Sequence, residues 1–290
     1  MNRPSPLNWL VPVIIFLAVI TSGAGLFVGG GEGRYQFVNP RGVSVEMYGE
    51  GLYRYDSLMA GAGFRGTDAV TLFISIPLLL VSYILSRRGS YKFHIILLGV
   101  LYYFLYNGAS MTFSAGFNPL FLVYTALFST SLFAVIVGLT TFDLEGLAKR
   151  ILPGFPRRRI AVFNIAIGII TFLLWMSEII PSLMTGKAPE NLGPYTTMFT
   201  HGFDSAVITP AAVLAGIFIL QRKPLGYLLA APTMILCALV GAVVIGQTIS
   251  QALEGIVFPV GVYIGLVGSW IIMGGFAIWL TIGYFRHLDG

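Results

Sequence analysis

Long apolar runs separated by short polar connections extend along the whole chain. Eight runs are long enough, at about 1.5 Å per residue, to cross a hydrocarbon core of roughly 30 Å as helices. We expect them at Leu10–Val28, Thr67–Leu85, Tyr91–Phe113, Pro119–Leu139, Ile160–Met184, Asp204–Leu220, Leu225–Gln251 and Ile256–Tyr284. The pattern therefore predicts an all-α integral membrane protein with eight transmembrane helices.

One long polar segment, residues 30–66, separates the first run from the second. Tyr35–Val38 and Val43–Tyr48 have the composition of short strands, and Asn39–Gly42 between them contains the Pro and Gly of a turn. We expect a small β-hairpin that caps the helix ends. The glycine-rich residues 60–66 are expected to form the loop that leads back to the membrane.

A short pattern of glycine, aspartate, basic residue and tyrosine occurs twice at a constant spacing. Gly66 corresponds to Gly202, Asp68 to Asp204, Arg87 to Lys223 and Tyr91 to Tyr227. Order, spacing and charge sign agree between the two copies. The chain is therefore predicted to contain two four-helix repeats, residues 1–139 and 160–290, joined by a connection at 140–159.

The composition supports the membrane class. The chain of 290 residues is 56% hydrophobic and 10% charged, with a mean hydropathy of +0.84, so its excess apolar surface must face the lipid bilayer. The net charge of +5 does not indicate nucleic acid, because the basic residues lie in short connections. Cys237 is the single cysteine, and no nucleotide loop, zinc pattern or haem ligand pair occurs, so we expect no cofactor and no metal.

Lysine and arginine are distributed unequally over the two sides of the predicted membrane. Most of the 17 basic residues, including Arg3 and the five in the 140–159 connection, fall on alternate connections that share one side. A basic excess marks the cytoplasmic side, so we expect a bacterial inner (plasma) membrane protein with both termini cytoplasmic and parallel repeats. The alternative for the first run is a signal peptide cleaved near Ser22–Ala24.

Polar side chains within the apolar runs identify the candidate site, because such groups are costly in lipid. Each group also has a purely structural alternative. An aspartate at the start of a helix can serve as a helix cap, and buried amides can form interhelical hydrogen bonds. Glu178 can also reach the headgroups. We expect one outward-facing polar cavity lined by Asp68, Asp204, Glu178, Asn107, Gln247 and Tyr103.

This cavity predicts a protein that binds or transports a small solute or ion, with the carboxylates holding a cation or a proton. One alternative is a membrane sensor or assembly factor that uses its extracytoplasmic cap. Another is an enzyme acting on outer-leaflet lipid with Asp68 or Glu178 as acid or base, although no catalytic motif is present. Gly261 and Gly265 form a GxxxG pattern that suits a homo-oligomer contact.

Three segments, Gly51–Ser57, Gly66–Val70 and Arg222–Tyr227, carry a resemblance to known proteins. They resemble bacterial multi-pass membrane proteins to which no activity is assigned. The resemblance extends over most of the chain. It implies no cofactor and no site residue, so the predictions above rest on the residues alone.

Overall fold

Eight helical stretches in the computed structural model, which describes residues 6–289, are long and apolar enough to cross a membrane. They are α1 (Leu7–Phe27), α2 with η2 and α3 (Leu58–Val70, Thr71–Ser75, Ile76–Ser86), α4 (Tyr91–Ser114), α5 (Phe121–Thr140), α7 (Arg157–Thr185), α8 with η4 and α9 (Phe199–Phe203, Asp204–Ile208, Thr209–Leu220), α10 (Pro224–Leu253), and α11 with η5 and α12 (Val260–Val262, Tyr263–Gly268, Ser269–Arg286). Short helices α6 (Leu144–Lys149), η1 (Gly51–Tyr53) and η3 (Glu190–Leu192) lie in connections. The prediction of eight helices with the length and apolar character of membrane spans is confirmed, while Arg3 lies outside the described residues.

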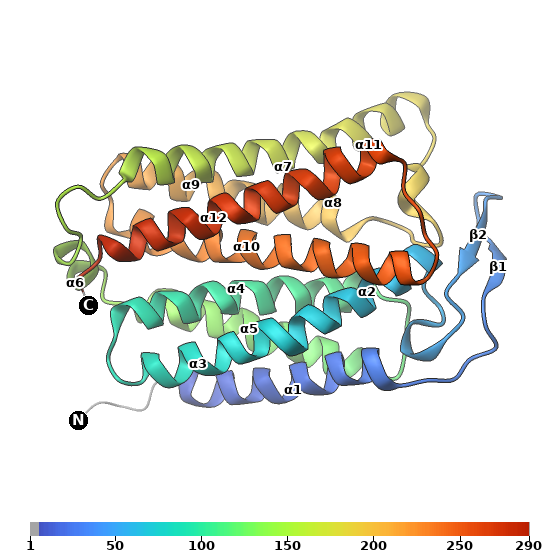
Figure 1. Ribbon diagram of the computed structural model, residues 1–290, viewed down its shortest axis with the longest axis horizontal. Coiled ribbons are helices and arrows are strands. Elements are labelled where there is room, and N and C mark those ends of the chain that lie inside the picture. Colours follow the sequence, from blue (N-terminus) through green and yellow to red (C-terminus); the bar gives the residue numbers. More distant parts are fainter. Residues whose placement is uncertain (1–5, 290) are drawn as a thin grey trace.

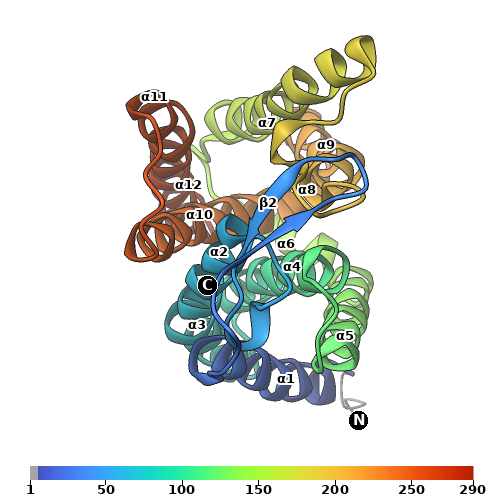
Figure 2. The same ribbon diagram turned by 90° about the vertical axis from the view of Figure 1, so that its right-hand side faces the viewer.

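The long helices lie side by side, and the β-hairpin projects from one end of the bundle, which we call the hairpin end (Figure 1). α1 begins and α12 ends at the opposite end. Viewed from the hairpin end, α1 to α5 form one group and α7 to α12 another (Figure 2). α4 and α10 contact each other between the groups, and each is 67% buried over its most apolar stretch, against 33% or less in the other six spans.

The second span begins at Leu58, earlier than the predicted start at Thr67, so residues 60–66 are helix and not loop. Ser57 caps the helix by accepting a hydrogen bond from the Ala60 N–H at 3.2 Å. The glycines permit close packing, because a Cβ added at Gly66 would lie 2.3 Å from the Gly246 carbonyl oxygen of α10. Tertiary contact thus outweighs the low helix propensity of glycine.

This earlier start changes the position of both aspartates. Asp68 lies about three turns inside the helix and is buried, so it is not a helix cap. Asp204 follows the single turn of α8 and opens the π-helical turn η4, as Asp68 precedes the π-helical turn η2. Pro77 and Pro210 follow these turns, and their missing N–H groups release carbonyls in the preceding turn, which accounts for the local widening.

The predicted hairpin is confirmed. β1 (Tyr35–Val38) pairs antiparallel with β2 (Ser44–Met47), with Tyr35 opposite Met47. In the turn, the Asn39 side-chain oxygen accepts hydrogen bonds from the N–H groups of Arg41 at 2.9 Å and Val43 at 3.0 Å. The hairpin also reaches the second half of the chain, because the Asn39 amide donates to the Gly193 carbonyl oxygen at 2.9 Å.

Candidate functional site

Four of the six candidate residues lie in two separate clusters, and the other two, Gln247 and Asn107, lie outside them. Asp68 and Tyr103 belong to the first cluster, which we define as Tyr53, Asp68, Thr71 and Tyr103 and call the Asp68 cluster. Asp204 and Glu178 belong to the second, defined as Tyr106, Trp175, Glu178, His201 and Asp204 and called the Asp204 cluster. Gln247 lies between α2 and α10, and Asn107 is buried on α4.

Asp68 is almost fully buried and accepts a hydrogen bond from a buried tyrosine. The Tyr53 hydroxyl donates to the Asp68 Oδ2 at 2.5 Å, and the two residues are 1% and 3% exposed. Burial raises the pKa of Tyr53, and the neighbouring Asp68 charge raises it further, so the phenol keeps the proton that it donates. α1 closes over this pair, since a Cβ on Gly25 would lie 1.7 Å from the Asp68 Oδ2.

Hydroxyl groups continue from Asp68 along the same helix toward the membrane interior. The Thr71 and Tyr103 hydroxyls are 2.5 Å apart, and Thr71 also donates to the Thr67 carbonyl at 2.8 Å. Ser75 follows one turn later, and its buried hydroxyl lies close to the Tyr103 hydroxyl. From Asp68 to Ser75 this polar face extends about 10 Å along the helix axis.

An open pocket of about 140 Å³ at the hairpin end reaches the Asp68 cluster. Its wall includes residues 25–29 at and just beyond the end of α1, the segment 50–53, and Tyr48 and Arg65. Gly25 and Tyr53, which both contact Asp68, belong to this wall. The pocket therefore extends from the surface to the hydrogen-bond partner of the buried carboxylate.

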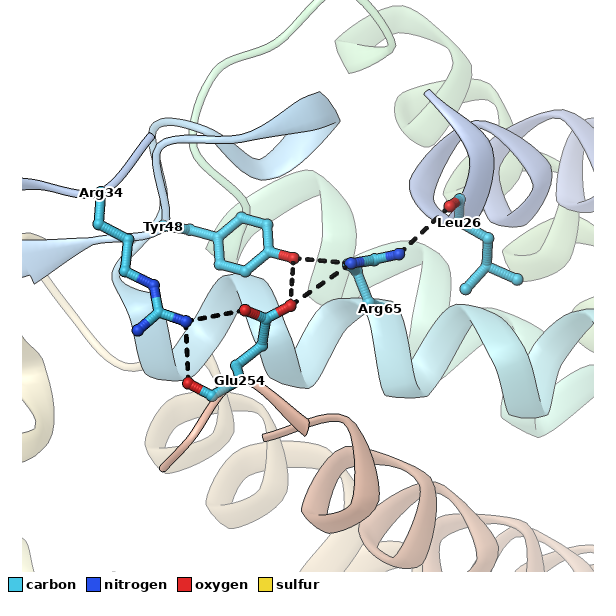
Figure 3. Close-up of polar contacts among 5 residues, drawn as sticks. All are labelled: Leu26, Arg34, Tyr48, Arg65 and Glu254. Atoms are coloured by element: carbon cyan, nitrogen blue, oxygen red, sulfur yellow. Dashed lines mark hydrogen bonds and ion pairs between the residues drawn. The ribbon is translucent and has the colours of Figure 1, made fainter. Parts of the chain in front are cut away.

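A charged network that includes the pocket residues Tyr48 and Arg65 joins the two halves of the chain (Figure 3). Glu254, at the end of α10, forms ion pairs with Arg34 at 2.9 Å and Arg65 at 3.5 Å. Tyr48 donates to Glu254 at 3.0 Å and accepts from Arg65 at 2.9 Å. Arg65 also donates to the Leu26 carbonyl of α1 at 3.4 Å, so its charge is held at the pocket wall.

Gln247 forms a hydrogen bond between two helices. Its amide donates to the Thr67 hydroxyl at 2.9 Å, and Gln251 donates to the Met59 carbonyl at 3.1 Å. Both bonds join α10 to α2, beside the close approach of Gly66 to Gly246. These contacts show Gln247 holding two helices together next to the Asp68 cluster.

The Asp204 cluster lies in the second half of the chain. The Trp175 indole donates to the Asp204 Oδ2 at 2.9 Å, and the Tyr106 hydroxyl of α4 also interacts with this carboxylate. Asp204 lines a cavity of about 30 Å³, room for one or two water molecules. Half-exposed Glu178 lies 3.2 Å from His201, whose ring contacts Trp175.

α4 contributes a residue to each cluster, because Tyr103 contacts Thr71 and Tyr106 lines the same cavity as Asp204. The two aspartates therefore have different partners, and their hydrogen bonds come from different helices. The six predicted residues thus do not all share one set of direct contacts, and each cluster is a separate candidate site.

Sequence reasoning did not include Tyr53, Trp175, His201 or Asp56 in the site. Asp56 is fully buried, and its Oδ1 accepts hydrogen bonds from the Gly116 N–H at 2.7 Å and the Tyr195 hydroxyl at 2.8 Å. It thereby joins the loops that follow α4 and α7. The available signal was the density of aromatic and charged residues in 51–56, which indicates a folded segment.

We expect stability to depend on the charge of Asp56. Burial raises the pKa of its carboxyl group to about 6, against the hydrogen bonds from Gly116 and Tyr195 that lower it. The folded state therefore binds a proton more tightly than the unfolded state, and this contribution to stability is lost as the pH rises through about 6. Between pH 5 and pH 7 the loss is about 1 kcal/mol.

Thermal unfolding in detergent between pH 5 and pH 7 checks this. Asp56→Asn should remove that part of the pH dependence, because the amide stays neutral. Exposed Glu46, replaced by Gln, serves as the matched control and should retain the wild-type dependence. An unchanged pH profile in Asp56→Asn would assign the dependence to other groups.

A Cβ added at Gly261 or Gly265 would have no atom of the described residues within 4 Å. Their predicted role in a homo-oligomer stays a prediction.

No protein-family model, curated protein or solved structure matches this chain. Eight helices long and apolar enough to cross a membrane indicate a multi-pass membrane protein, and its buried polar clusters are the candidate sites.

Proposed function

We propose that the protein binds and transports a small cation or a proton through the Asp68 cluster. One observation carries the proposal: a buried carboxylate accepts a hydrogen bond from Tyr53, and Tyr53 forms part of the wall of an open polar pocket. The basic residues concentrated at the opposite end favour an extracytoplasmic hairpin end. The pocket would then open outward from a bacterial inner membrane.

The chemistry of the cluster suits a hard cation or a proton. An ionised carboxylate inside a membrane protein is costly unless it is neutralised or paired, and one phenol hydrogen bond compensates only part of that cost. Thr71, Tyr103 and Ser75 add hydroxyl oxygens beyond Asp68, and oxygen atoms are the preferred ligands of hard cations. A pocket of about 140 Å³ admits a hydrated ion or a solute of a few heavy atoms.

Transport also requires that a cation bound at the Asp68 cluster reach the opposite side of the membrane. The helix widens at η2 immediately beyond Asp68, and π-helical turns are frequent where helices serve function. Movement of α2 and α3 about this turn would expose the hydroxyl face to the opposite end. The two halves would act as parallel repeats around α4 and α10, the buried pair at their junction.

The two alternatives have narrower support. Exposed apolar side chains on the hairpin, Phe37, Val38 and Val43, would suit a partner surface for a sensor. The Glu178 and His201 pair would suit acid or base chemistry on lipid. Neither feature connects a surface pocket with a buried carboxyl group, whereas the Asp68 cluster does so through Tyr53.

Blocking the pocket tests the proposal. Gly29 lies on the pocket wall, and a side chain there meets no atom within 4 Å, so Gly29→Cys should fold normally. Labelling this variant with a membrane-impermeant cationic thiol reagent should lower H⁺, Na⁺ or K⁺ flux in proteoliposomes at least fivefold. The wild type is the matched control, because its single cysteine, Cys237, is buried.

Two results would contradict the proposal. One is undiminished flux after complete labelling of Gly29→Cys, verified by mass spectrometry. The other is a wild-type protein that passes none of the three cations under either an inward or an outward gradient.

A further inference from the structure

A second open feature, a groove between α7 and α12, lies at the end of the bundle opposite the hairpin. α7 packs mainly against α9, and α12 packs mainly against α10, which leaves a groove of about 750 Å³ between α7 and α12. Its walls are apolar and are formed by Val162, Phe163, Ile170, Met273, Phe276 and Trp279. Phe276 and Trp279 are each 54% exposed, so large aromatic surfaces face the groove or the lipid around it.

The groove has a basic end. Arg158 and Arg159, in the first turn of α7, belong to its lining and are exposed. Neighbouring Arg157 differs, because its Nε donates to the Tyr227 hydroxyl at 2.7 Å. Among the described residues no ion pair engages Arg158 or Arg159. Two guanidinium groups are therefore available where α7 begins.

We propose that this groove binds an anionic phospholipid. Guanidinium groups match phosphate geometry with paired hydrogen bonds, and basic pockets between transmembrane helices suit anionic headgroups. The phosphate would lie at Arg158 and Arg159, and an acyl chain would extend over Phe163 and Phe276 toward the membrane centre. The site is separate from the Asp68 cluster and does not depend on the proposed transport.

Charge and polarity favour this occupant over the others. A small polar solute would gain nothing from walls that are almost entirely apolar. A second copy of this chain would carry the same arginines into the contact and bury like charges together. A zwitterionic phospholipid fits the walls equally well but gains less from two arginines, so headgroup charge should decide the affinity.

Quenching of Trp279 by brominated lipid tests the site in the purified full-length protein. Brominated phosphatidylglycerol should quench tryptophan fluorescence at a concentration at least fivefold lower than brominated phosphatidylcholine. Trp279→Phe should remove this difference and so assign it to the groove. Arg158→Gln with Arg159→Gln should raise the half-quenching concentration of phosphatidylglycerol at least fivefold.

The matched control is Arg87→Gln with Arg88→Gln, which removes the same charge at the same end but away from the groove. It should change the half-quenching concentration less than twofold. Equal quenching by the two lipids, an equal loss in the control, or a dimer that shields Trp279 from both lipids would each overturn the proposal. Melting temperatures in lipid-free detergent verify that all variants are folded.

Discussion

Asp68→Asn should lower cation flux in proteoliposomes at least tenfold and leave the fold intact. Asparagine keeps the size of the side chain and an oxygen that can accept the Tyr53 hydrogen bond, so the contacts with Gly25 and Tyr53 survive. It cannot carry the negative charge that would attract a cation, and it cannot exchange a proton. The flux of H⁺, Na⁺ and K⁺ under matched gradients measures the change.

The flux of three other variants shows whether the effect is specific to Asp68. Tyr53→Phe should reduce flux less than Asp68→Asn, because it removes one hydrogen bond and keeps the charge. Exposed Glu32, replaced by Gln, should leave flux within twofold of the wild type. If Asp68→Asn retains wild-type flux and Asp204→Asn loses it, the transport site belongs to the Asp204 cluster instead.

Gly66→Ala should destabilise the protein by about 1–3 kcal/mol, the cost of overpacking in a close helix contact. A Cβ at this position would lie 2.3 Å from the Gly246 carbonyl oxygen and 2.5 Å from the Gln247 nitrogen. Both are backbone atoms of α10, so relief requires α2 and α10 to separate, which also lengthens the Gln247 hydrogen bond to Thr67. Unfolding in mixed micelles measures the loss.

The sign of the stability change in Gly66→Ala is informative, because alanine in a helix is intrinsically favoured over glycine by about 1 kcal/mol. Gly275→Ala in α12 is the matched control, since a Cβ there meets no atom within 4 Å, and it should be neutral or stabilising. Equal stability of Gly66→Ala and the wild type would show that the helices do not approach as closely as described.

The apolar pattern was sufficient to predict the eight helices and the hairpin. A helix in lipid satisfies its own backbone, so a run of apolar residues of the right length is enough to specify it. The turn at Asn39–Gly42 is likewise local, because one side chain and one glycine with φ of 78° form it. Parallel repeats and the orientation of the chain in its membrane stay predictions.

The predicted start of the second span at Thr67 was wrong, and the reason is physical. Glycine-rich residues such as Gly61–Gly66 have low intrinsic helix propensity, and only their close contacts with Tyr48 and α10 make a helix favourable there. That error also made Asp68 look like a candidate cap, whereas Ser57 has this role.

The sequence by itself determined the class of this protein and the list of costly polar residues, because hydrophobic length and charge are properties of the chain. Only the tertiary structure decided which of them meet. Asp68 accepts a hydrogen bond from Tyr53 in the segment before its helix, and Asp204 accepts one from Trp175 of α7. Gln247 of α10 donates to Thr67 of α2. Such partners depend on how helices pack and rotate against each other, and hydrophobic spacing in a membrane protein constrains that rotation weakly, because lipid accepts any apolar face.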